Sequence, residues 1–136
     1  MPAHDVQQVQ RISGSITLAS ASWADLSASD LTIDVINPDG WFLLLLEGTI
    51  QSSGTNRHLF LDFLVGAARI GQTWGLMEKW SNVNGDRDLC CLVAFTHISQ
   101  PSSTVTIRPQ YKVTNPWVFY ADSLYSPARF AVVALF

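Results

Sequence analysis

Apolar and polar residues alternate along much of this 136-residue chain, which is the pattern of β-strands with one buried face. The alternation is clearest in 104–113, where Val105 and Ile107 share one phase and Thr104 and Thr106 the other. Further strand-like runs, bounded by Gly, Pro, Asn and Ser turns, occur at 11–20, 31–36, 57–65, 89–98 and 117–122. The pattern predicts eight or nine strands, little or no helix, and an all-β jelly-roll sandwich.

Two segments are apolar in both phases, which a strand with one solvated face would not show. Residues 41–51 predict a central strand covered on both faces, and together with 57–65 they predict a β-hairpin. In the segment 129–136, Phe130 and Val132 lie in one phase, and Ala131 and Val133 lie in the other. Only one phase can face the interior of a sandwich, so the other needs a cover. A second copy of the chain is one candidate. A loop or the N-terminal residues of the same chain are the alternative.

Pro109 falls in the apolar phase of the 104–113 run. Proline has no N–H to donate to a β-ladder, and it is therefore found at sheet edges and bulges. The run predicts an edge or a bulge at this position.

The start of the chain is polar and Gln-rich and lacks the apolar stripe of a helix. We therefore expect residues 1–12 to form an arm ahead of a jelly-roll domain that spans 13–136. The arm residues expected to contact partners are Val6, Gln7, Gln8, Val9 and Gln10.

Charged residues make up only 14% of the chain, against roughly 25% in an average soluble domain. Their place is taken by 35 Ser, Thr, Asn and Gln residues. The net charge of −3 and the scattered Lys and Arg residues exclude the basic footprint of nucleic-acid binding. The longest apolar run, 41–46, is far shorter than the ~20 residues of a membrane span, and we see no secretion signal. A polar, weakly charged surface indicates contact with other proteins or with carbohydrate, and neither nucleic acid nor membrane is expected as a partner.

Cys90 and Cys91 are adjacent, and neighbouring residues of a strand point to opposite faces. Without a second pair they make a poor disulfide and a poor metal site. We interpret them as small apolar residues of the core or an interface, kept reduced in a cytosol.

Candidate catalytic groups are few. Glu47 and Asp62 could mimic the acid pair of a glycosidase, but ion pairs with Arg57 or Arg69, or plain exposure, explain them more simply. The three histidines have no metal-ligand spacing, and no nucleophile elbow is present. The acidic turn at 86–88 fits a solvated loop better than a Ca²⁺ site. The sequence therefore predicts no catalytic residues, no metal and no cofactor.

Trp74 and Trp80 lie in the least regular segment of the chain. Exposed, they could stack on a sugar or anchor an interface; alternatively, both are buried under the long loop. Trp23 and Trp41 start or precede strands and are expected in the core.

The order of elements after residue 89 resembles a known family. An apolar strand and a His-containing turn (95–98) lead to Thr-Val-Thr-Ile-Arg-Pro-Gln-Tyr at 104–111, an aromatic strand at 117–122 and an apolar final strand at 130–136. This order is similar to the C1q/TNF-like jelly rolls, and within them to the compact versions of bacteriophage virion proteins. The glycine that the family places before the His-containing strand is absent, and Ala134 replaces its usual acidic residue.

The resemblance implies a homotrimer around a threefold axis. It implies a structural virion protein, made in the host cytoplasm, that decorates and stabilises a phage capsid by contacting the major capsid protein or neighbouring virion proteins. The alternative is the receptor- or carbohydrate-binding head of a tail fibre or spike, which would use Trp74 and Trp80. The candidate residues for the trimer interface are Tyr111, Phe130, Val132, Ala134 and Phe136.

Overall fold

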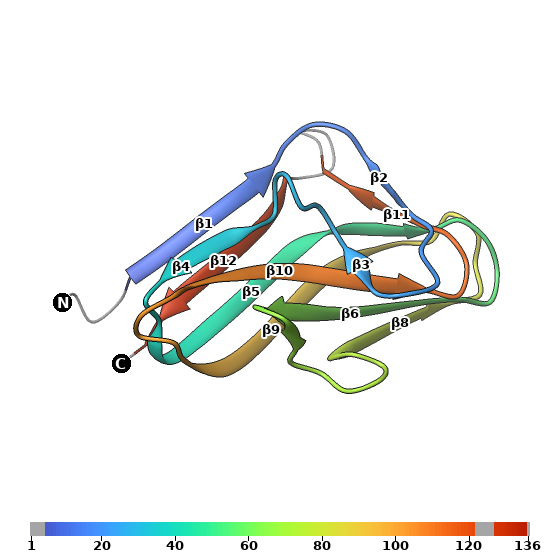
Figure 1. The fold of residues 1–136 in the computed structure, drawn as a ribbon. Helices are drawn as coiled ribbons and strands as arrows, with labels where there is room; N and C mark the ends of the chain where they lie inside the picture. Colours follow the sequence, from blue (N-terminus) through green and yellow to red (C-terminus); the bar gives the residue numbers. More distant parts are fainter. Residues whose placement is uncertain (1–4, 122–126, 136) are drawn as a thin grey trace.

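The structure is a computed structural model that describes residues 5–121 and 127–135, and these form two antiparallel β-sheets packed face to face (Figure 1). Within this part there are twelve strands and no helix, which confirms the all-β sandwich. Several of the strands not expected from the sequence are only two to five residues long. The strands are β1 (Asp5–Arg11), β2 (Ile16–Leu18), β3 (Ala24–Asp25), β4 (Ile33–Ile36), β5 (Asp39–Ser52), β6 (Arg57–Val65), β7 (Ala68–Arg69), β8 (Met77–Ser81), β9 (Arg87–Ser99), β10 (Thr104–Val113), β11 (Trp117–Tyr120) and β12 (Ala128–Ala134).

The first sheet, sheet A, is built around the long strand β5. Strand β9 pairs with one edge of β5 over residues 39–51. The other edge is divided between β12, opposite 42–47, and β11, opposite 49–52. Strand β1 adds to β12 and β2 adds to β11. Nearly the whole length of β5 is therefore paired on both edges.

The second sheet, sheet B, lies in front of sheet A in Figure 1, with β10 and β6 at its centre. Strands β4 and β3 share the outer edge of β10, whereas β7 and β8 share the outer edge of β6. Of the expected edge or bulge at Pro109, an edge strand is wrong for β10 as a whole, because β6 pairs with one side of it and β4 and β3 with the other, but the outer ladder is interrupted at Pro109 itself. The ladder beside it passes from β4, opposite 104–107, to β3, opposite 110–111, and its carbonyl accepts a 3.0 Å bond from the N–H of Leu26. Pro109, which has no N–H, therefore lies between the end of the β4 pairing and the start of the β3 pairing, where no ladder bond is lost.

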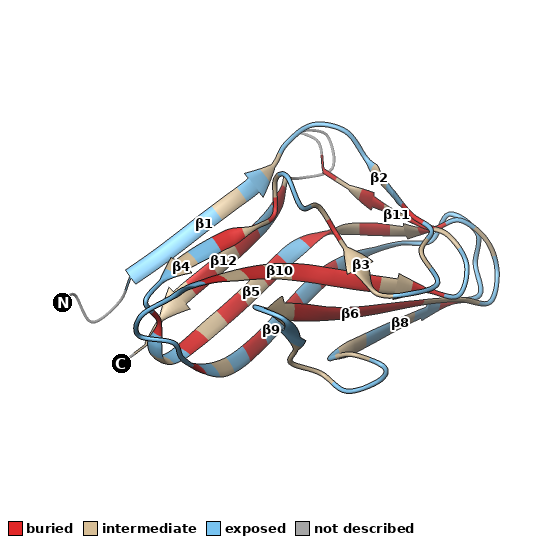
Figure 2. Ribbon diagram, viewed as in Figure 1, coloured by how far each residue is buried: buried red, intermediate tan, exposed pale blue. Residues whose placement is uncertain are grey.

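The core consists of the inward phases of both sheets, seen in Figure 2 as the alternating buried positions along the strands. Phe63 of β6 and Phe130 of β12 stack across the two layers, with ring centroids 5.7 Å apart. The ring of Phe119, also fully buried, lies against the backbone of Gly48 on β5. The stack of Phe63 on Phe130 joins the two sheets, whereas the Phe119–Gly48 contact lies within sheet A, between β11 and β5. The described residues contain no helix long and apolar enough to cross a membrane.

The predicted hairpin of 41–51 and 57–65 is wrong. Strand β5 belongs to sheet A and β6 to sheet B, so the turn between them carries the chain from one layer to the other. A hairpin and such an arch use the same turn residues. What differs is that β9, β12 and β11 occupy both edges of β5, which leaves no edge for β6.

The structure also places residues 5–11 of the expected arm inside sheet A. They form β1, which pairs along its full length with β12, from Asp5 opposite Ala134 to Arg11 opposite Ala128. An ion pair between Arg11 and Asp30 (2.5 Å) holds its end. Most of β1 is exposed (Figure 2), because this edge strand is held by backbone bonds more than by packing. Residues 1–4 of the expected arm lie outside the described residues.

Candidate functional site

The outer face of sheet A is apolar across four neighbouring strands. The registers place Phe95 beside Leu43, Leu43 beside Val133, and Val133 beside Val6 on β1. Paired residues point to the same side of a sheet, so each row forms a continuous strip. We call this surface the apolar face, and it consists of Val6, Trp41, Leu43, Leu45, Leu89, Cys91, Val93, Phe95, Ala131 and Val133.

Several side chains of the apolar face are well exposed. Phe95 is 62% exposed, Trp41 51% and Val93 50%, and Val6 and Leu89 are at least as exposed as Val93. Cys91 is exposed as well, and the other members of the face are half-buried. Exposed apolar side chains that lie next to one another on neighbouring strands often mark an interaction surface.

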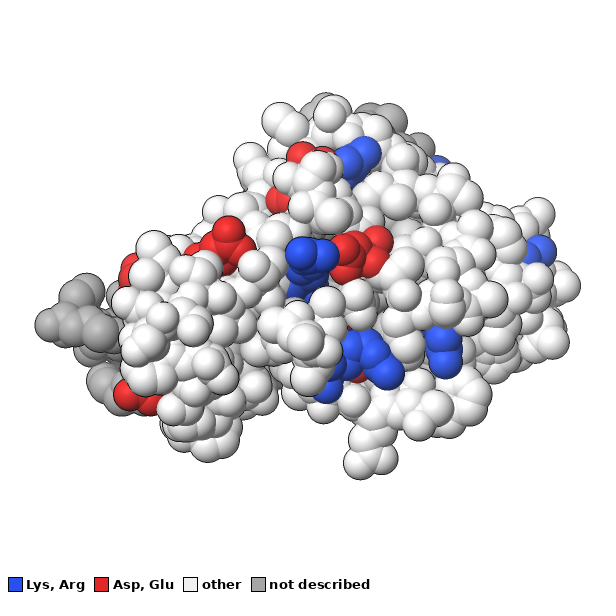
Figure 3. All heavy atoms as spheres, in the orientation of Figure 1, with Lys and Arg blue, Asp and Glu red and all other residues white. Residues whose placement is uncertain are grey.

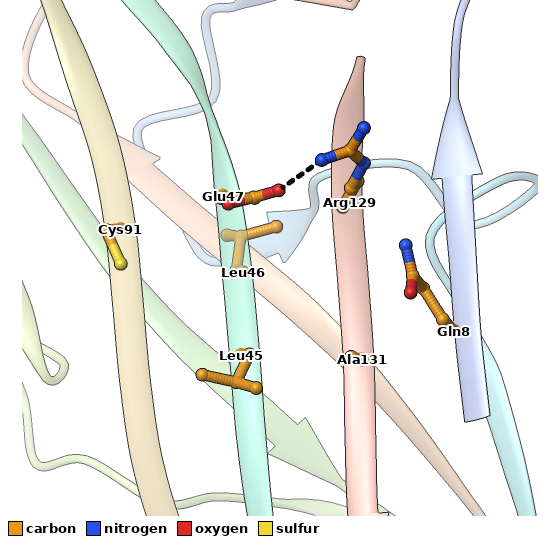
Figure 4. Close-up of a pocket in the computed structure, with 7 residues that line it drawn as sticks. All are labelled: Gln8, Leu45, Leu46, Glu47, Cys91, Arg129 and Ala131. Atoms are coloured by element: carbon orange, nitrogen blue, oxygen red, sulfur yellow. Dashed lines mark hydrogen bonds and ion pairs between the residues drawn. The ribbon is translucent and has the colours of Figure 1, made fainter. Parts of the chain in front are cut away.

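An ion pair interrupts the apolar face where β5, β12 and β9 run side by side. Glu47 accepts a 3.0 Å bond from Arg129 across the β5–β12 pair. A shallow pocket of about 270 Å³ opens beside the pair (Figure 4). The pocket is lined by Gln8, Leu45, Leu46, Glu47, Cys91, Arg129 and Ala131. The ion pair supplies a polar feature that any partner covering this face must match.

The two cysteines separate as expected for neighbours in a strand. Cys91 is exposed on the apolar face, whereas Cys90 is buried in the core. Burial raises the pKa of the Cys90 thiol to about 12. The reactivity of the Cys91 thiol can therefore be used to measure how accessible the apolar face is to solvent.

The residues proposed from the sequence for a trimer interface lie on the wrong side of the strands. Tyr111, Phe130 and Val132 are buried between the two sheets, and Ala134 packs against the same core. Phe136 lies outside the described residues. Since Phe130 already stacks on Phe63, this phase of β12 is covered within one chain. The phase that remains to be covered contains Ala131 and Val133.

The expected arm contacts divide between the two sides of β1. Val6 and Gln8 lie opposite Val133 and Ala131 and share the outer side with Gln10, whereas Val9 packs against the core. Gln7 and Gln10 are exposed. The apolar face therefore extends onto β1 through Val6.

The other outer face, that of sheet B, holds both loop tryptophans. Trp74 is 63% exposed and Trp80 is 57% exposed, so the alternative in which a loop buries them is wrong. The expectation of a core position for Trp41 is also wrong, because its side chain lies on the apolar face, edge-on to His97. Trp23 is half-buried, beneath Arg69. Figure 3 shows this side of the molecule, where a few charged side chains, several of them near the middle, are scattered over a mostly uncharged surface.

The acidic candidates form separate ion pairs. Asp62, on β6, is fully buried and bonds Arg69 at 3.2 Å, whereas Glu47 is on the other sheet. In the 86–88 turn, Asp88 accepts a 2.7 Å bond from Lys79, which lowers the pKa of Asp88. Among the residues that the structure describes, no group of three or more His, Cys, Asp or Glu side chains could hold a metal ion.

No protein-family model matches the sequence, and no curated protein matches it. Solved structures of infectious bursal disease virus do match the fold. A chain of the T13 viral particle is 9% identical with a TM-score of 0.54, over 96% of this chain and 35% of the viral one. The VP2 subviral particle is 10% identical with a TM-score of 0.54, over 97% and 37%. The Gx strain is 9% identical with a TM-score of 0.52, over 96% and 36%.

These structural neighbours belong to virus particles, and this chain spans about a third of their length. At identities near 10% the likeness concerns the fold.

Proposed function

We propose that this chain is a structural protein of a virus particle and that copies of it associate through the apolar face. The observation that carries the proposal is the continuous apolar strip from Phe95 through Leu43 and Val133 to Val6. The fold that the chain shares with virus-particle proteins supports a role in a virion.

The open edge of β9 supports a second copy as the occupant. Within the described residues this 13-residue strand pairs only with β5, so its other edge presents backbone N–H and C=O groups. A long open edge beside an apolar surface promotes association unless it is covered. Another copy of the same chain is always present at matching concentration, and its own apolar face also needs a cover.

The finer form of this proposal is a trimer that decorates a bacteriophage capsid. Its support is the resemblance of the strand order to compact C1q/TNF-like jelly rolls. Strand β1 is the candidate for contact with the major capsid protein or a neighbouring virion protein. In the described part of the chain it pairs only with β12, and its second edge can accept a strand from a partner.

Sedimentation of matched variants tests the association. The wild-type chain of 15.0 kDa should sediment at micromolar concentration as a particle of about 45 kDa, three times its own mass. Val93→Glu places a carboxylate on the apolar face, where association would bury it. It should weaken association at least about 100-fold, since an unpaired buried charge costs several kcal/mol. Val83→Glu is the control, because Val83 is similarly exposed (60%) but lies outside the apolar face. A monomeric wild-type chain, or equal association of the two variants, would refute association through the apolar face.

The thiol of Cys91 gives a second readout of the same face. Its reaction with a maleimide should slow at concentrations at which wild type associates, but not in Val93→Glu. Labelling that is independent of concentration in the wild type would show that this face stays open to solvent.

A further inference from the structure

The outer face of sheet B carries a small aromatic pocket beside Trp74, on the side of the sandwich opposite the apolar face. The pocket has a volume of about 350 Å³ and is lined by His58, Phe60, Trp74, Glu78 and Thr114. From its geometry we propose that it binds an uncharged pyranose sugar of a glycan, with Trp74 as the stacking platform.

The loop that presents Trp74 is fastened to β6 on both sides of it. The backbone N–H of Gly71 donates to both carboxylate oxygens of the buried Asp62, at 3.0 and 3.1 Å. Beyond Trp74, Gly75 adopts φ +77°, and a Cβ there would lie 2.6 Å from the carbonyl oxygen of Leu61. Such a tight approach requires glycine. Trp74 is therefore held in place while most of its surface remains in water.

Phe60 and Glu78, which both line the pocket, are neighbours in one row of paired residues. Phe60 lies between Lys112 on β10 and Glu78 on β8. The Trp74 ring packs on Phe60 with centroids 5.3 Å apart, and the Lys112 ammonium, outside the lining residues, lies 4.6 Å from the Trp74 centroid. The pocket thus has an aromatic floor with an acceptor, Glu78, on one side and a cation held against the Trp74 ring.

A contact with His58 orients the carboxylate of Glu78. Nδ1 of His58 lies 2.6 Å from Oε1 of Glu78, and the His58 ring stacks on Phe60 at an interplanar angle of 9°. The Glu78 side chain remains half exposed. Thr114 adds a hydroxyl, whose oxygen accepts a bond from the backbone N–H of His58. Fixed polar groups around an apolar floor are the usual composition of a small-molecule site.

This chemistry suits a neutral sugar better than the other ligands of similar size. A pyranose presents C–H groups on one face and hydroxyls around its rim, which matches an indole bordered by a carboxylate, an imidazole and an ammonium group. Glu78 lines the pocket, whereas Lys112 lies against the Trp74 ring outside the lining, so a phosphate or a sialic acid carboxylate in the pocket would meet a carboxylate, and the chain carries a net charge of −3. A protein partner would have to bury the carboxylate of Glu78 and the imidazole of His58 for a small apolar gain.

A glycan array of uncharged and sialylated structures, followed by calorimetric titration of the best uncharged hit, tests the proposal. Trp74→Ala should weaken binding at least 10-fold, and Glu78→Gln, which keeps the shape but removes the charge, about 5-fold. Trp41→Ala is the matched control, because it removes an exposed tryptophan from the opposite face, and it should stay within 2-fold of wild type. The proposal is overturned if no uncharged glycan binds, if only acidic glycans bind, or if Trp74→Ala and Glu78→Gln retain wild-type affinity. Equal loss in Trp41→Ala would overturn it as well.

The sugar site and the proposed association can be tested independently of each other. Trp74→Ala should sediment like wild type, and Val93→Glu should bind the glycan with unchanged affinity when both are measured per chain. Loss of glycan binding in Val93→Glu would place the sugar on the apolar face instead.

Discussion

Substituting Gly48 by Ala should destabilise the fold, although the residue lies in a regular strand. Its Cβ would stand 2.4 Å from Cζ of Phe119 and 2.9 Å from Cε1. Because Phe119 is fully buried, its ring has no open space into which to move. Overpacking of this kind costs about 1–3 kcal/mol, or a drop in Tm of about 3–5 °C per kcal/mol for a domain of this length. Without the clash, the same substitution would stabilise by about 0.4–1 kcal/mol through the unfolded chain.

A double-mutant cycle isolates the contact. Phe119→Leu removes the ring atoms in question and should cost about 1–2 kcal/mol on its own. The double variant Gly48→Ala/Phe119→Leu should then be no less stable than Phe119→Leu, giving a favourable coupling of about 1–3 kcal/mol in urea unfolding. A Gly48→Ala variant as stable as wild type, or strictly additive effects, would show that the strand and the ring adjust freely.

Three further perturbations follow from the buried groups and ion pairs. One thiol per native chain, Cys91, should react with a maleimide at pH 8, and Cys90 only after unfolding; mass spectrometry showing two labels on native protein contradicts its burial. Asp62→Ala should cost about 3–5 kcal/mol in urea unfolding because it strands the guanidinium and N–H groups bound to a fully buried carboxylate. Glu47→Ala, which breaks an exposed pair, should cost at most about 1 kcal/mol, and equal costs would contradict this difference. The pKa of Asp88 is lowered from 3.8, so its contribution is present above that value and is lost as pH falls through the folded-state pKa. Thermal melts from pH 7 to pH 2 should therefore show the small gap between wild type and Asp88→Asn closing in acid, whereas a gap that persists at the lowest pH would contradict the shift.

The strands were predictable because alternation is a local property. The run at 104–113 is β10, and β12 (Ala128–Ala134) covers the last apolar run as far as Ala134, close to where the sequence places them. Strand partners are not local, which is why the arch between β5 and β6 was predicted as a hairpin. Strand β1 was missed because its Val6 and Val9 lie on opposite sides, so it carries no one-sided pattern.

The sequence predicts that an apolar surface is left uncovered, but not which residues form it. An uncovered apolar phase on the final strand follows from the sequence, but both phases of β12 are apolar, and its own residues do not decide which one turns inward. Phe63 on the facing sheet decides it, by stacking on Phe130. In the same way, the exposure of Trp74 depends on the distant carboxylate of Asp62, which no spacing in the sequence reveals.

The apolar face also sets a schedule for synthesis. Its members run from Val6 to Val133, so the face is incomplete until the ribosome has made nearly all of this segment. At ~5–20 residues per second, that interval lasts roughly 6–25 s. Nascent chains on neighbouring ribosomes therefore cannot yet meet through the complete strip, which only finished domains display. Pairing of strands that lie far apart in the sequence gives a high contact order, which slows folding. Sheet A is complete only when β12, its last strand, has paired with β5 and β1.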